Sequence, residues 1–163
     1  MKNKFIYFAS LILLAACHQD NKQTSSTQQD TAEVQKSLVK PAQIAETPWS
    51  AKLDTATQKF KMSPSALVQT QDLDPENVCK ALNTKYPEII AQYVKQSNDT
   101  LFVKIADATY LTQSAGNMGA DIYMAEATYS FTQIPGVNFV NFNFEEGDHA
   151  APGTFKRGDF DFK

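Results

Sequence analysis

A strand–helix–strand pattern between residues 101 and 144 limits the possible folds of this chain more than any other part of the sequence. In 101–105, Leu101, Val103 and Ile105 take every second position, the period of a strand. In "VNFVNFNF" at 137–144, Val140, Phe142 and Phe144 lie on one face and Asn141 and Asn143 on the other, as in a strand with one covered face. Between these stretches, 115–133 carries an apolar stripe at helical spacing, made of Met118, Ile122, Ala125 and Tyr129. This order predicts a crossover unit in which a helix joins two parallel strands.

The junction between that helix and the second strand reads "TQIPGV" at 132–137. Pro135 cannot continue a helix, because its ring blocks the turn before it and it has no amide hydrogen. Gly136 permits a positive φ, and Val137 is expected to begin the second strand. The sequence therefore predicts that the helix stops at this point and that Gly136 takes a left-handed conformation.

A second helix is expected to start at Asp74, which supplies an N-cap acceptor before Pro75 at the first helical position. Its apolar face is formed by Val78, Ala81 and Leu82. The helical spacing continues beyond Pro87 through Ile89, Ile90, Tyr93 and Val94. We therefore expect either a kinked helix or a second helix there, ending at "SND" in 97–99.

The segment 49–70 is less clearly patterned. Phe60 and Met62 alternate with lysines, which suits an edge strand, and "PSALVQT" at 64–70 is a further candidate strand. Together these patterns predict one small α/β (α+β) domain over 48–163, with helices packed on one face of a short sheet.

The N-terminus has the layout of a secretory leader, with Lys2 and Lys4 before an apolar run at 5–14. The run is too short to cross a bilayer as a helix, which needs about 20 residues. Leu14-Ala15-Ala16-Cys17 resembles the bacterial lipobox, which implies cleavage after residue 16 and attachment of fatty acyl chains to Cys17. The alternative is a chance cysteine beside an ordinary cleavage site.

Acylation of Cys17 would hold the chain on a membrane through its lipid. His18 follows Cys17 in place of the Asp that favours inner-membrane retention, so we expect outer-membrane sorting with the domain facing the periplasm. The stretch 17–47 is rich in Gln, Ser, Thr, Asp and Lys, and it holds few large apolar residues. It is expected to be a disordered tether between the lipid and the domain.

The charge balance argues against nucleic acid as a partner. The chain has 15 basic and 18 acidic residues, a net charge of −3, and loss of Lys2 and Lys4 with the leader makes it about −5. Without basic clusters, binding to nucleic acid is not expected. With Cys17 acylated, Cys79 is the remaining cysteine, either a buried small apolar residue or the site of a disulfide-linked dimer.

The stretch 107–147 resembles the C-terminal half of the GerMN domain, found in sporulation and spore-germination proteins and in other bacterial lipoproteins. The matching residues are Asp107, Gly116, Gly119, Phe131-Thr132-Gln133, Pro135-Gly136-Val137, Val140 and Gly147. The resemblance implies a strand, a glycine-containing loop, a helix and a closing strand. It supplies no catalytic residue and no cofactor.

The best candidate for chemistry is the acidic turn "EEGDH", where Glu145, Glu146, Asp148 and His149 follow the last clear strand. Carboxylates and an imidazole can hold a divalent metal or act as acid and base, but a solvated polar turn has the same composition. Two functions follow. The favoured one is a lipid-anchored, non-catalytic module that binds an envelope protein or cell-wall partner. The alternative is a small metal-dependent or hydrolytic enzyme that uses the turn.

Overall fold

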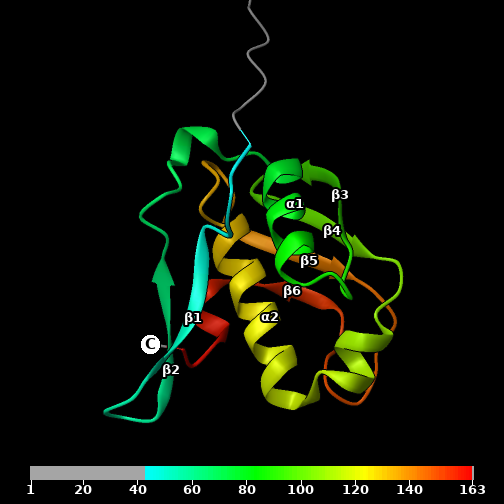
Figure 1. The fold of residues 1–163 in the computed structure, drawn as a ribbon. Helices are drawn as coiled ribbons and strands as arrows, with labels where there is room; N and C mark the ends of the chain where they lie inside the picture. The colour runs from blue at the N-terminus through cyan, green and yellow to red at the C-terminus, as the bar shows by residue number, and fades with distance from the viewer. Residues whose placement is uncertain (1–42, 163) are drawn as a thin grey trace, which may run out of the picture. The chain divides into compact units, whose positions relative to one another are not determined.

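The structure is a computed structural model that describes residues 43–162 (Figure 1). Its strands are β1 (Trp49–Asp54), β2 (Lys59–Pro64), β3 (Ala91–Ser97), β4 (Thr100–Ile105), β5 (Phe139–Asn143) and β6 (Gly153–Phe155). Its α-helices are α1 (Pro75–Lys85) and α2 (Gly116–Phe131), and single helical turns lie at Thr70–Asp72, Tyr110–Ser114 and Arg157–Asp159. The expected leader, Cys17 and the tether up to residue 42 lie outside the described residues.

Four of the strands form one sheet in the order β3-β4-β5-β6. β4 and β5 are parallel, while the outer pairs are antiparallel. The crossover through α2 is therefore confirmed, and α1 and α2 lie against one face of this sheet (Figure 1). The core between them buries Leu101, Val103, Ile105, Val140 and Phe142 from the strands and Tyr123 and Phe131 from α2. The predicted α+β class, with helices packed on a sheet, is correct.

The start of α1 is as predicted, because the Asp74 carboxylate accepts a hydrogen bond of 2.7 Å from the Asn77 amide and Pro75 is the first residue of the helix. Its predicted continuation is wrong. Tyr86, which precedes Pro87, has left the helical region at φ −125° and ψ 72°, as a residue before proline tends to do. The apolar residues beyond Pro87 lead into β3, and "SND" forms the β3–β4 hairpin turn with Asn98 at φ 54°.

The long helix α2 matches its predicted range to within two residues at each end, and Gly136 has the predicted positive φ, at 81°. The predicted stripe is only partly correct, since Met118 is 55% exposed. The buried side chains of α2 include Tyr123, Met124, Ala127 and Phe131. Beyond its first turns α2 is covered by the large sheet and also by β1, so it is buried around much of its circumference.

A second sheet, which was not predicted from the sequence, is the β1–β2 hairpin beside α2 (Figure 1). The strand around Phe60 and Met62 is confirmed, whereas "PSALVQT" is not a strand beyond its first residue, Pro64. The short strand β6 and the turn at 157–159 were also missed. Among residues 43–162, no helix combines the length and the apolar character needed to cross a membrane.

Candidate functional site

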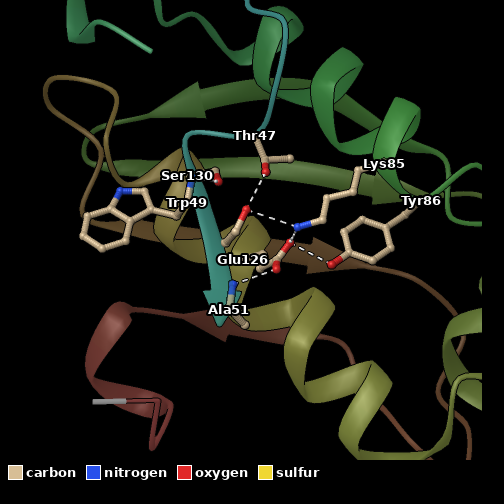
Figure 2. Close-up of polar contacts among 8 residues, drawn as sticks. Thr47, Trp49, Ala51, Lys85, Tyr86, Glu126 and Ser130 are labelled. Atoms are coloured by element: carbon tan, nitrogen blue, oxygen red, sulfur yellow. Dashed lines mark hydrogen bonds and ion pairs between the residues drawn. The ribbon is translucent and has the colours of Figure 1, made fainter. Parts of the chain in front are cut away.

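The most unusual polar group of the domain is Glu126, a carboxylate on α2 whose side chain is 2% exposed (Figure 2). Its Oε1 accepts a hydrogen bond of 2.8 Å from the Ala51 amide of β1. Its Oε2 accepts bonds of 2.6 Å from Lys85 Nζ and 2.7 Å from the Tyr86 hydroxyl, both at the end of α1. A buried carboxylate is stable only with such partners, and here one side chain joins β1, α1 and α2.

Glu126 acts together with Ser130, which lies one helical turn further along α2. The Ser130 hydroxyl accepts a hydrogen bond of 3.2 Å from the Trp49 amide, two residues before Ala51 (Figure 2). Four residues advance a helix by about 6 Å and two residues advance a strand by about 6.6 Å, so the spacings match. Glu126 and Ser130 of α2 thereby accept hydrogen bonds from two backbone amides on the edge of β1. Without these acceptors, the two amides would be free to pair with another strand.

Lys85 is less buried than its partner, with 37% of its side chain exposed. Besides Glu126, its ammonium group contacts the Ser50 hydroxyl at 3.2 Å, and Ser50 contacts the Thr47 hydroxyl at 3.2 Å. These three residues line a shallow hollow with Ala45, Glu46, Ala81 and Thr84. The hollow lies beside residues 45–47, at the start of the described domain. The contacts from Thr47 through Ser50 to Lys85 therefore hold this segment against α1.

Burial raises the pKa of three side chains, Tyr86, Tyr123 and Cys79. Desolvation and the hydrogen bond to Glu126 raise the pKa of Tyr86 far above its ordinary value, so the phenol stays protonated and donates. Desolvation likewise raises the pKa of Tyr123, whose ring packs edge-on against Tyr86 with centroids 5.1 Å apart. Desolvation raises the pKa of Cys79 to about 12. The Cys79 thiol is buried and free, as the burial alternative predicted, and a protonated thiol is a poor nucleophile.

A second polar cluster forms around Arg157 near the C-terminus. Its guanidinium lies 4.8 Å from the ring centroid of Trp49 and 5.1 Å from that of Tyr129. It also donates to Thr132 Oγ1 at 2.8 Å, to the Tyr129 carbonyl at 2.9 Å and to Gln133 Oε1 at 3.0 Å. Planar stacking and a fixed fork of donors are what arginine offers and lysine does not. Arg157 thus ties the C-terminal segment to the end of α2.

In the structure, the two halves of the acidic turn, Glu145-Glu146 and Asp148-His149, have different surroundings. Glu145 and Glu146 are exposed and line a hollow with Asp107, Thr109, Thr112 and Gln113 among others. The Asp107 carboxylate accepts from the Thr109 amide at 3.0 Å, and this bond lowers the pKa of Asp107. Within residues 43–162, no group of three or more His, Cys, Asp or Glu side chains is placed to hold a metal ion.

The other half of the turn is held against the start of α2 and the segment before it. His149 Nδ1 lies 2.8 Å from Asn117 Oδ1, and the His149 amide donates to the Thr112 carbonyl at 3.0 Å. Gly147 passes so close to this segment that a Cβ there would lie 2.7 Å from the Cβ of Thr112. Asp148 is exposed. His149 therefore contacts Asn117 and Thr112, whereas Glu145 and Glu146 line the hollow beside Asp107.

Sequence reasoning missed both Glu126 and Arg157. Glu126 had one detectable signal, since it is the single charged residue between Ile122 and Phe131 in a stretch predicted to be helical. Arg157 had none, because its aromatic partners lie far away in the sequence. In the comparisons with known proteins, no family model, no curated protein and no solved structure matches this chain.

Proposed function

We propose that this protein is a lipid-anchored, non-catalytic binding or assembly module of the bacterial cell envelope. The observation that carries the proposal is the order of features at the N-terminus: a short basic and apolar leader, Leu14-Ala15-Ala16-Cys17, and a polar segment before one small domain. This order suits a protein held on a membrane by lipid and separated from it by a spacer. His18 after the cysteine favours the outer membrane, with the domain in the periplasm.

The non-catalytic part of the proposal is supported by what the polar groups already do. Both oxygens of Glu126 accept bonds that hold β1 and α1 in place. His149 is engaged by Asn117, and burial keeps the Cys79 thiol protonated. Groups committed to holding the fold are poor candidates for acid, base or nucleophile. Binding through the surface needs none of them.

The likeness to the GerMN domain remains part of the proposal. The order of β4, a connecting segment that ends at Gly116, α2, the turn at Gly136 and β5 is the order that this likeness implies. A GerMN-like domain on a lipid anchor fits an assembly role, in which the domain contacts an envelope protein or cell-wall material.

The anchor is tested by mass spectrometry of the mature N-terminus. We expect Cys17 to be the first residue and to carry diacylglyceryl and acyl groups, and Cys17→Ser to remain unprocessed. Cys79→Ser is the matched control, because it removes the other cysteine and should leave processing intact. A mature chain that begins elsewhere without lipid would contradict the proposal.

The binding role is tested by crosslinking in intact envelopes, followed by purification of the lipidated protein and identification of what is attached. We expect a defined envelope protein or cell-wall fragment that is absent when Cys17→Ser replaces the wild type. Hydrolysis of simple ester or glycoside substrates by the purified chain, lost in Glu145→Ala, would overturn the non-catalytic assignment.

A further inference from the structure

One groove of the described domain combines an exposed methionine and two half-buried phenylalanines with an excess of negative charge. It lies between the tip of the β1–β2 hairpin, the first turns of α2 and the C-terminal segment, and has a volume of about 790 Å³. It is lined by Gln58, Lys59, Phe60, Met118, Asp121, Asp159, Phe160, Asp161 and Phe162. This volume is within the range of ligand sites, about 300 to 1,000 Å³.

The apolar part of the groove is a set of aromatic rings beside one methionine. Phe60 and Phe162 pack edge-on with centroids 6.2 Å apart, and Phe160 is buried. Met118 is 55% exposed, although it was expected on the buried stripe of α2. A flexible, polarizable side chain on a surface suits contact with varied apolar partners.

The charged part is three aspartates against one lysine. Asp159 accepts a hydrogen bond of 2.9 Å from the Lys156 amide. The ion pairs of the described residues are Lys61–Asp54 and Lys85–Glu126, so no cation among residues 43–162 pairs with Asp121 or Asp161. Carboxylates at the rim of an apolar groove attract a partner of opposite charge.

We propose that this groove binds a protein segment that presents apolar side chains flanked by lysine or arginine. The proposal rests on the binding role proposed above and names the chemistry of the partner. A second copy of this chain is disfavoured, because a net charge of about −5 after loss of the leader brings like charge to an acidic groove. An anionic membrane surface is disfavoured for the same reason.

The test uses the lipidated full chain in phosphatidylcholine nanodiscs, with ¹³C on the methionine methyl groups. After the leader the methionines are Met62, Met118 and Met124, so Met118 reports on the groove and buried Met124 is an internal control. The probes are the acetylated, amidated tetrapeptides KFLK, EFLE and KSSK. We expect KFLK to shift the Met118 signal saturably and to leave Met124 unchanged, and we expect EFLE and KSSK to have no effect.

Variants test the role of charge. Asp121→Asn and Asp161→Asn are each expected to weaken KFLK binding by about two- to fivefold, the effect of one exposed charge pair. Asp148→Asn, an exposed carboxylate in the acidic turn, is the matched control and should leave binding unchanged. Raising the salt concentration to about 1 M should also weaken binding.

Three results would overturn the proposal: no response of Met118 to KFLK, an equal response to EFLE, or a Met118 shift that grows with protein concentration without peptide. The last would indicate that two copies of the chain cover the groove. If KFLK does not bind the groove but crosslinking still captures a partner, the proposed envelope role is retained and only the groove proposal is wrong. If Cys17 is unmodified and Met118 still responds, the anchor is wrong and the groove stands.

Discussion

The Ala51 amide and the Glu126 carboxylate, 75 residues apart in the sequence, are joined by a hydrogen bond of 2.8 Å. This bond places an edge strand of one sheet against the helix that covers the other sheet. Since Oε2 of the same carboxylate holds Lys85 and Tyr86, the hairpin and both helices depend on one buried charge. Its loss should therefore affect the whole domain.

Glu126→Gln is expected to lower the free energy of unfolding by about 2 to 3 kcal/mol, because the amide cannot accept at both oxygen positions and a buried donor is left without a partner. Lys85→Met should cost a similar amount by leaving the carboxylate without its cation. Urea unfolding of both variants and of the double variant gives the coupling, expected at about 1 to 3 kcal/mol. Additive losses would mean that the two residues act independently.

Gly147→Ala is expected to destabilise the domain by about 1 to 3 kcal/mol through overpacking. The new Cβ would lie 2.7 Å from the Cβ of Thr112 and close to Gln113. Thr112 has little freedom to move, because it is buried and its hydroxyl donates to the Ala108 carbonyl at 2.9 Å. Gly158→Ala is the control, since a Cβ there would have no atom within 4 Å apart from its own residue and the two adjacent residues. Equal melting temperatures for the two variants would contradict the packing at Gly147.

Gly136→Val is expected to cost about 1 to 3 kcal/mol for a different reason. Nothing lies within 4 Å of a Cβ there, so the cost comes from φ at 81° alone. Gly136→Asn should be milder, because asparagine tolerates the left-handed region better than valine does. Thermal melts of the two variants check this order, and a valine variant as stable as the wild type would refute it.

Alkaline pH is expected to weaken the fold through Cys79. The ordinary pKa of a cysteine thiol is 9.0, and burial in the folded chain raises the pKa of Cys79 to about 12, so above pH 9 the unfolded chain has lost a proton that the folded chain keeps. Stability contributed by the protonated thiol is therefore present below pH 9 and is lost as pH rises toward 12, by up to about 1.4 kcal/mol per pH unit. Urea midpoints between pH 8 and 10, measured with a reductant, should fall less steeply for Cys79→Ala. Identical slopes would show that the thiol does not titrate differently on unfolding.

The local features could be predicted from the sequence alone, because each depends on neighbours in the chain. Asp74-Pro75 specified the start of α1, Gly136 specified its own positive φ, and alternation specified which residues of β4 and β5 are buried. The same reasoning failed beyond Pro87. The apolar spacing of residues 89–94 fits a helix, yet the hairpin turn at Asn98 pairs this segment with β4, and pairing between strands is not visible in periodicity.

The polar side chains that hold the elements together could not be identified without the folded structure. Glu126 is buried because β1 crosses α2 at that turn, and Arg157 is placed by Trp49 and Tyr129. The groove at Met118 likewise joins three segments that are distant in the sequence. Contacts of this kind depend on how the hairpin and the C-terminal segment pack against α2. No local propensity encodes that packing, since its free energy comes from burial shared among all of these elements.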